Sequence, residues 1–184
     1  IINMKCIVSV IVCLAATFSS FGQGLFKGAN GNARFFSDAL LEDIEANTNK
    51  VTSAYNVATG EVAVLIPIKS FSFEKTLMQE HFNENYLESD KYQDATFKGK
   101  VVGTRTLKPG EMHLVNISGN LTIHGVTKPR DIQTSLKLNS DGSLLATGEF
   151  DLKIEEHKIK VPSLVFQNIA EIVEVSFELL LKQN

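Results

Sequence analysis

Four histidines are the side chains best suited to acid–base or metal chemistry in this sequence: His81, His113, His124 and His157. His81 precedes Glu84 by three residues, so the two side chains could share a helix face and offer two ligands to a metal. Two ligands make a weak site, and no second histidine follows at the spacing of four that helical zinc sites use. The sequence therefore predicts no metal site and no cofactor, and a polar network is the simpler role for His81.

The other histidines fall at predicted turns and strand ends. His124 directly precedes Gly125, where its ring would hydrogen-bond a turn or meet the polar end of a ligand. His157 follows two glutamates, which predicts a solvated loop, and His113 begins a predicted strand. A general base at His81 or His124 remains an alternative hypothesis, in which the protein is a small-barrel enzyme. No Gly-x-Ser-x-Gly elbow or glycine-rich phosphate loop accompanies them, which favours a protein that is not an enzyme.

Length and charge narrow the function classes further. The chain has 184 residues, which is enough for one domain with a sizeable core and short for two. It carries 21 acidic and 18 basic residues, a net charge of −3, and no basic stripe. This balance argues against nucleic-acid binding, which usually requires a basic surface.

The N-terminal segment differs from the rest of the chain. A short basic start precedes an apolar run from Cys6 to Phe18, and small, turn-forming residues follow. This order is typical of a secretory signal peptide, and the run is shorter than the about 20 residues of a spanning helix. We expect residues 1–23 to be removed and the domain of residues 24–184 to be periplasmic or secreted, without a stable membrane span. Both cysteines, Cys6 and Cys13, lie in the segment that would be removed.

Alternation of apolar and polar residues dominates the remaining sequence and predicts β-strands. The predicted strands cover Lys50–Val57, Glu61–Ile68, Ala95–Gly103, His113–Ile123, Asp131–Leu138, Leu144–Ile154 and Glu171–Lys182. Residues Gly125 to Pro129 are predicted to turn the chain between two of them. About seven or eight antiparallel strands with one apolar face can close into a barrel that has no free edge. At about eight strands, the interior can hold side chains or one small ligand.

Two stretches interrupt the alternation. In Lys75–Ser89, Met78, Phe82 and Tyr86 recur every four residues, as on one face of a helix. Residues Lys160–Ala170 contain a proline followed by a serine, which predicts a second short helix. A helix between barrel strands often covers the barrel mouth, so we expect the first stretch to form a lid.

Three blocks of the sequence resemble the YceI-like family of secreted lipid-binding proteins. These blocks are Phe71–Gly99, Ser118–Lys128 and Gly148–Pro162, and with Phe36-Ser37 the resemblance spans Asn32 to Leu181. The third block departs from the family pattern, because Glu155–Ile159 replaces an acidic-aromatic pair before an isoleucine.

The resemblance implies an all-β protein, namely an antiparallel, lipocalin-like β-barrel of about eight strands with one or two short helices. It also implies that the apolar interior holds a long isoprenoid or fatty chain in the periplasm. The side chains expected to contact such a lipid are Phe71, Phe73, Met78, Phe82, Tyr86, Phe97, Val101, Ile117, Phe150 and Phe177. His81 and His124 are candidates for contact with a headgroup.

Our leading hypothesis is therefore an exported carrier or sink for an amphiphilic or isoprenoid lipid. Each methylene moved from water into an apolar cavity contributes about 0.8 kcal/mol, so binding needs no catalytic group. Besides the enzyme, a barrel filled by its own side chains that binds a protein partner through the lid is an alternative. The pattern leaves a monomer and a homodimer both open.

Overall fold

A computed structural model describes residues 24–38, 43–103, 106–160 and 170–183 of the chain. Nine strands make up most of it: β1 (Leu25–Ser37), β2 (Ile44–Asn56), β3 (Glu61–Pro67), β4 (Ser72–Phe73), β5 (Asp94–Val102), β6 (Met112–Ile123), β7 (Val126–Leu138), β8 (Leu144–Lys153) and β9 (Ile172–Gln183). The predicted signal peptide, residues 1–23, and most of the predicted second helix, residues 161–169, lie outside the described residues. Within the described part, no helix is both long and apolar enough to cross a membrane.

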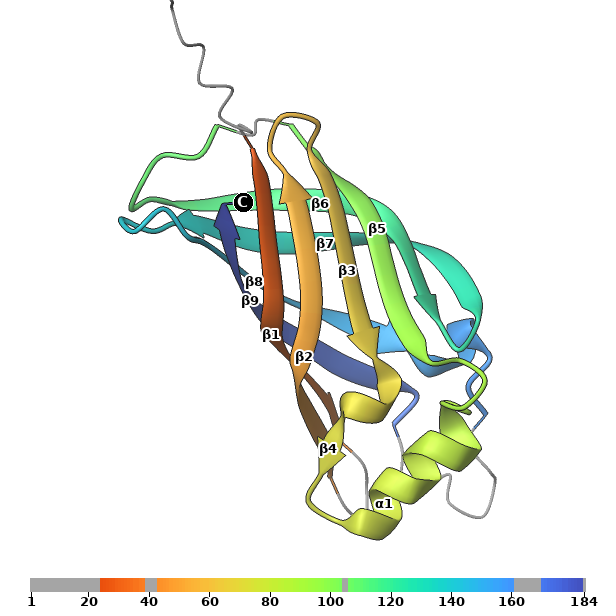
Figure 1. Cartoon of the computed structure of the whole chain (residues 1–184). Helices are drawn as coiled ribbons and strands as arrows, with labels where there is room; N and C mark the ends of the chain where they lie inside the picture. Colours follow the sequence, from red (N-terminus) through yellow and green to blue (C-terminus); the bar gives the residue numbers. More distant parts are fainter. Residues whose placement is uncertain (1–23, 39–42, 104–105, 161–169, 184) are drawn as a thin grey trace, which may run out of the picture.

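Eight of these strands close into an antiparallel barrel, which confirms the predicted fold class (Figure 1). The strands follow the order β1-β9-β8-β7-β6-β5-β3-β2, and β2 pairs with β1 to close the ring. Phe35 on β1 lies opposite Ala46 on β2 and opposite Val175 on β9. Since every long strand has two neighbours, the barrel has no free edge along which chains could aggregate.

The first strand was not predicted, and the second begins earlier than predicted. The sequence of β1 contains two glycines and two asparagines, residues that are poor strand formers alone. Its pairing with β2 shifts register between Gly28 and Ala33, which bends the strand. Pairing on both sides therefore holds in the sheet a segment whose own residues do not favour a strand.

The turn predicted over Gly125 to Pro129 is wrong, because β7 already begins at Val126. The connection from β6 is the two-residue turn His124-Gly125, and both residues have positive φ angles of 51° and 71°. Such a turn matches the twist of a hairpin. Pro129 fits inside β7 because β7 pairs with β8 only from Thr134 onward. The stretch around Pro129 therefore needs hydrogen bonds to β6 alone.

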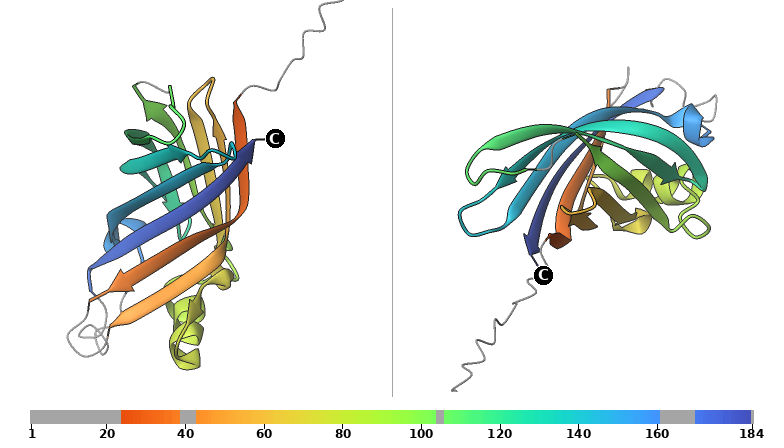
Figure 2. Two further views of the ribbon diagram at one scale, coloured as in Figure 1. Left: turned by 90° about the vertical axis from the view of Figure 1, so that its left-hand side faces the viewer. Right: turned by 90° about the horizontal axis from the view of Figure 1, so that it is seen from above.

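A segment between β3 and β5 covers one end of the barrel (Figures 1 and 2). It contains the 3₁₀ turn η1 (Ile68–Ser70), strand β4, helix α1 (Thr76–His81) and the π-helical turn η2 (Phe82–Tyr86). The helix predicted over Lys75–Ser89 is confirmed, although only its first half is α-helical. We call residues 68–93 the lid segment. A further 3₁₀ turn, η3 (Ile154–His157), follows β8 at the same end.

Candidate functional site

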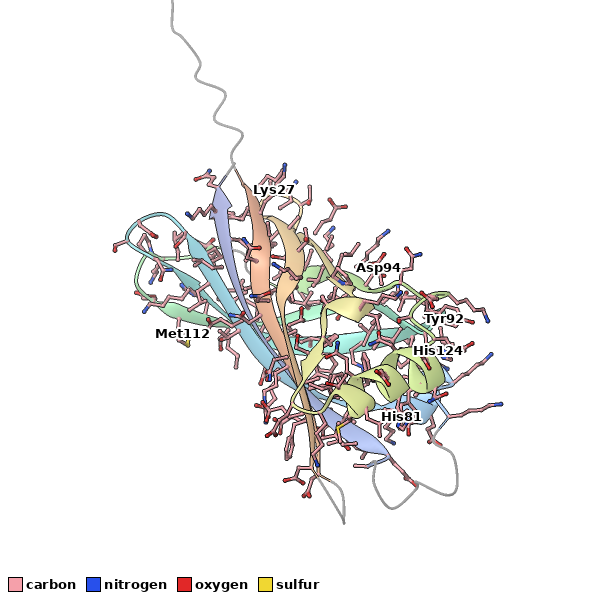
Figure 3. The ribbon with its side chains drawn as sticks, turned by 60° about the horizontal axis from the view of Figure 1, so that its bottom comes forward. Lys27, His81, Tyr92, Asp94, Met112 and His124 are labelled. Atoms are coloured by element: carbon pink, nitrogen blue, oxygen red, sulfur yellow. The ribbon has the colours of Figure 1, made fainter. Side chains whose placement is uncertain are left out.

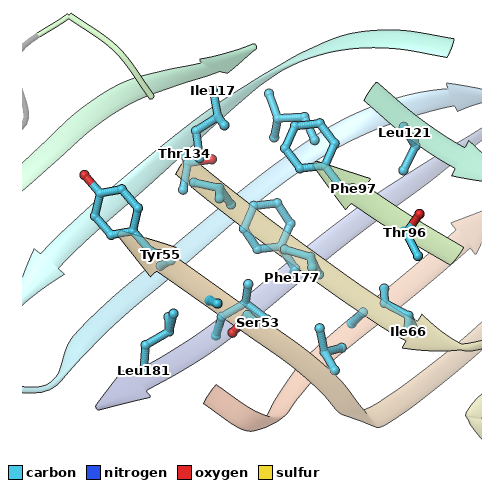
Figure 4. A pocket seen from close by; sticks show the side chains of 18 of the residues that line it. Ser53, Tyr55, Ile66, Thr96, Phe97, Ile117, Leu121, Thr134, Phe177 and Leu181 are labelled. Carbon is cyan, nitrogen blue, oxygen red and sulfur yellow. The ribbon is translucent and has the colours of Figure 1, made fainter. Parts of the chain in front are cut away.

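Two adjoining apolar cavities lie inside the molecule. The first, the barrel cavity, has a volume of about 110 Å³ and is lined only by strand residues (Figure 4). The second, the lid cavity, has a volume of about 170 Å³ and lies between the barrel and the lid segment. Five side chains line both cavities: Ile66, Ala95, Leu121, Phe150 and Val175. Each space is similar in size to the roughly 150 Å³ apolar cavity that is known to admit benzene in an engineered protein.

Glycines in the strands explain why the barrel cavity is not filled. Gly99 and Gly119 lie directly opposite each other on β5 and β6, and the Phe97 ring lies against both. A Cβ atom added at Gly119 would lie 2.8 Å from Cζ of Phe97. At Gly148, an added Cβ would lie 2.5 Å from Cζ of Phe177. The two rings therefore occupy space beside the wall that side chains at these glycines would otherwise take, and both rings line the open volume.

Four aromatic rings attach the lid segment to the barrel. Phe82, the first residue of η2, stacks on Phe35 of β1 with ring centroids 5.4 Å apart. Its ring also lies 4.9 Å from that of Phe73 and 5.9 Å from that of Phe71. Aromatic pairs at these distances stabilise a cluster beyond simple area burial. Asn83 supports the π-helical turn, because its Nδ2 donates a hydrogen bond of 2.8 Å to the Gln79 carbonyl.

All ten side chains that the sequence nominates for lipid contact lie on the walls of these cavities. Those on the lid cavity are Phe71, Phe73, Met78, Phe82 and Tyr86, those on the barrel cavity are Phe97, Val101, Ile117 and Phe177, and Phe150 lies on both. Sequence reasoning missed Phe35, which lies in the unpredicted strand β1. It also missed Ala95 and Leu121, although the alternation within β5 and β6 places both on the inner face.

Neither candidate headgroup residue lines a cavity. His81 ends α1 and is exposed to solvent. His124 lies in the β6–β7 turn, where its Nε2 is 2.7 Å from Oε2 of Glu88 and its Nδ1 is 3.2 Å from the His157 carbonyl (Figure 3). The Tyr92 ring packs edge-on against it at 4.5 Å. Both ring nitrogens of His124 therefore lie within hydrogen-bond distance of oxygen atoms of the protein.

This His124 network ties the lid segment to the β6–β7 turn. The hydrogen bond from His124 lowers the pKa of the Glu88 carboxyl. Glu88, His124 and Lys158 all have left-handed backbones, with φ of 43°, 51° and 57°. Non-glycine residues of this kind persist where surrounding contacts hold them in place. We infer a structural role for His124 at the edge of the lid.

The prediction that His157 lies in a solvated loop is wrong, because its side chain is fully buried. The turn η3 folds it beneath the β6–β7 hairpin, where Nδ1 donates to the Val126 carbonyl at 3.0 Å. Burial lowers the pKa of the His157 imidazole, which favours the neutral ring. His113 lies at the start of β6, as predicted, and is its second residue. Its Nε2 accepts a hydrogen bond of 3.0 Å from the backbone N–H of Lys108.

The walls of the barrel cavity carry few polar groups. Ser53 and Thr134 are buried there, and within the described residues neither hydroxyl has a hydrogen-bond partner. No three histidine, cysteine or acidic side chains gather to hold a metal ion in the part of the chain that the structure describes. The chemistry available inside the molecule is therefore that of an apolar container with isolated hydroxyls.

Comparison with known protein families identifies this fold, because the sequence profile of the YceI-like domain matches residues 21–181. The chain belongs to the YceI-like family. Its barrel resembles a polyisoprenoid-binding domain from Saccharophagus degradans implicated in plant cell wall breakdown, with a TM-score of 0.76, 18% identity, and coverage of 88% of this chain and 99% of that one. BcnA of Burkholderia cenocepacia is similar over 82% of this chain and 95% of its own, with a TM-score of 0.68 and 17% identity.

The YCEI protein of Campylobacter jejuni is also similar, with a TM-score of 0.59, 17% identity, and coverage of 78% of this chain and 86% of that one. At these identities the likeness concerns the fold. Among curated proteins, UPF0312 protein VPA0850 of Vibrio parahaemolyticus is 32% identical over 79 residues. That match covers 42% of this YceI-like chain and 39% of the Vibrio protein.

Proposed function

We propose that this YceI-like protein is an exported binding protein that holds an isoprenoid-like or fatty lipid in its two cavities, as a carrier or a sink. The observation that carries the proposal is the pair of adjoining apolar cavities, whose common wall is made of five apolar side chains. The likeness to a domain described as polyisoprenoid-binding supports the same ligand class. The signal-peptide pattern of residues 1–23 supports a periplasmic or secreted location.

An elongated ligand suits this arrangement better than a compact one. Each cavity alone is small, but together they extend from the barrel interior to the underside of the lid. A ten-carbon chain that ran through both would gain roughly 8 kcal/mol from burial before entropy losses are subtracted. The passage between them requires small movements of the shared side chains, of which Phe150 is the largest.

Binding is favoured over catalysis because, among the described residues, the cavity walls carry hydroxyls but no histidine, cysteine or acidic side chain. His81 points to solvent, and both nitrogens of His124 already face protein acceptors. The hydroxyls of Ser53 and Thr134 lack the adjacent base that would activate a nucleophile in the described residues. They suit a ligand with a hydroxyl or carbonyl group, because an unpaired buried hydroxyl costs about 1–3 kcal/mol that a partner would recover.

Native mass spectrometry of protein purified gently from its producing cell tests the proposal. We expect an added mass that extracts into chloroform, or uptake of added geranylgeraniol or palmitic acid. Ala95→Phe should block uptake by filling the shared wall, whereas Ala63→Phe, on the outer face of β3, should leave it unchanged. A cooperative thermal unfolding transition in both variants is the control for folding. A bare protein that refuses both lipids would contradict the proposal and favour a filled barrel.

A further inference from the structure

Exposed apolar side chains gather on the outer face of the barrel, at the end away from the lid. In the strand register, Met112 on β6 lies opposite Lys137 on β7, Lys137 opposite Leu145 on β8, and Leu145 opposite Leu180 on β9. Leu114 lies two residues after Met112 on the same face of β6, and Val102 on β5 lies opposite Asn116, two residues further along β6. Met112, Leu114, Val102 and Leu180 are exposed by 66%, 64%, 56% and 50%. We call these four residues, together with the half-buried Leu145, the β6–β9 patch.

The strand pattern shows that this patch is not part of the core. Leu144 and Leu181 precede or follow the patch residues Leu145 and Leu180 along β8 and β9, and Leu136 precedes Lys137 on β7. All three leucines line the barrel cavity. The patch residues therefore point outward, where a large apolar side chain contributes little free energy of burial to folding. Contiguous exposed apolar patches on a soluble protein usually mark an interaction surface.

Charge differs between the two ends of the barrel. Lys137 lies within the patch row, and Lys27 pairs with Lys182 across β1 and β9 beside it. At the opposite end, residues 68–94 contain six acidic and three basic residues. Figure 3 shows Lys27 and Met112 at the end away from His81 and His124. An anionic surface would therefore attract the patch end and repel the lid end.

We propose that the β6–β9 patch docks this protein on a membrane surface that contains anionic lipids. Apolar side chains would enter the headgroup region while the aliphatic stems of neighbouring lysines extend their ammonium groups to phosphates. In this orientation the lid end faces away from the bilayer. The patch lies outside the cavities, so the inference goes beyond the proposed function and can fail independently of it.

The absence of tryptophan from the sequence allows a direct test. Leu114→Trp places a single fluorophore in the patch, and Leu77→Trp places one on the lid, where Leu77 is 62% exposed. The full chain is used in both cases, so any contribution of residues 1–23 is common to them. With vesicles of phosphatidylcholine and about one-third phosphatidylglycerol, we expect a blue shift and quenching by brominated lipid for Leu114→Trp only. Added salt should weaken the response.

Vesicle flotation then measures the contribution of each part of the surface. The double variant Met112→Ser/Leu114→Ser should lose most of the binding, and Lys137→Gln/Lys182→Gln should weaken it by about fivefold per lysine. Leu77→Ser is the matched control and should bind like the parent protein. Thermal unfolding of each variant is the control for folding, and we expect midpoints close to that of the parent because the positions face outward.

Three results would overturn the inference. The first is a Leu114→Trp emission that does not respond to anionic vesicles. The second is an equal response of Leu77→Trp, which would place the contact elsewhere. The third is a concentration-dependent dimer that Met112→Ser/Leu114→Ser converts into a monomer without any vesicle binding by the parent, because the patch would then join two copies of the chain.

Discussion

The two cavities differ in how their walls are held. Every residue that lines the barrel cavity belongs to a strand with neighbours in the closed sheet. The lid cavity takes Ile68, Phe71, Phe73, Met78, Phe82, Tyr86 and Leu87 from the lid segment. The barrel cavity can therefore open widely only when the sheet unfolds, whereas the lid cavity can open by a local movement. In a binding protein of this design, the lid side is the route by which a ligand would enter.

The lid is attached to the barrel by the short pairing of β4 with β2, where Phe73 lies opposite Ala46, and by side-chain contacts. The aromatic cluster around Phe82 joins the lid to Phe35 of β1, and Glu88 adds its hydrogen bond to His124. Ser70 also shares a hydrogen bond of 2.7 Å with Thr48 of β2. These attachments suggest substitutions that separate local opening from global unfolding.

The largest effect is expected from Leu144→Ala in the barrel cavity. Leu144 is fully buried, so the substitution should lower the free energy of unfolding by about 4 kcal/mol. Urea denaturation measures this loss, and hydrogen exchange should accelerate across all the barrel strands together. Leu145→Ala is the neighbouring outward control and should cost less than about 1 kcal/mol. Equal losses from the two would contradict the assignment of the inner face.

Phe82→Ala should weaken the lid selectively, with a cost of about 3 kcal/mol. The substitution removes the ring that joins Phe35, Phe71 and Phe73. Hydrogen exchange should increase within residues 76–92 much more than within β6–β9. Leu77→Ala, an exposed change on the same helix, serves as the control. Uniform acceleration over the whole barrel would show that the lid does not open as a separate unit.

His157 makes stability depend on pH at the lid end. Its folded pKa lies below the ordinary value of 6.5, so below that value the unfolded chain binds more protons than the folded protein. Stability should therefore fall as pH decreases from about 7.5 to about 5.5. His157→Gln should reduce this dependence, as measured by urea denaturation at several pH values. An unchanged slope in that variant would assign the dependence to another group.

The smallest effect is expected where Glu88 meets His124. His124→Asn keeps a residue that tolerates the left-handed backbone and removes the imidazole. Hydrogen exchange of residues 86–92 should rise a few-fold while the global unfolding midpoint stays nearly constant. Because the Glu88 pKa is lowered, the parent should lose this contact as pH falls below about 4.5 through the folded pKa, and the variant should show no such step. A large global loss would make His124 a core residue instead.

Much of the barrel followed from the alternation of apolar residues. Residues such as Ile117, Leu136 and Phe177 reached the inner face as predicted, because a period of two leaves each strand only one way to bury its apolar side. The spacing of Met78, Phe82 and Tyr86 likewise predicted the lid helix. Local pattern was sufficient wherever one short stretch of chain contained the whole signal.

Other features depended on residues far apart in the sequence. Strand β1 is held by β2 and β9 in spite of its glycines, and His157 is buried because the β6–β7 hairpin covers it. The open cavity arises because Phe97 and Phe177 lie against glycines of neighbouring strands. The sequence alone determined which side chains face inward, through the period of the backbone. Only the tertiary structure decided where those side chains leave space, because packing depends on the register between strands that the chain brings together from a distance.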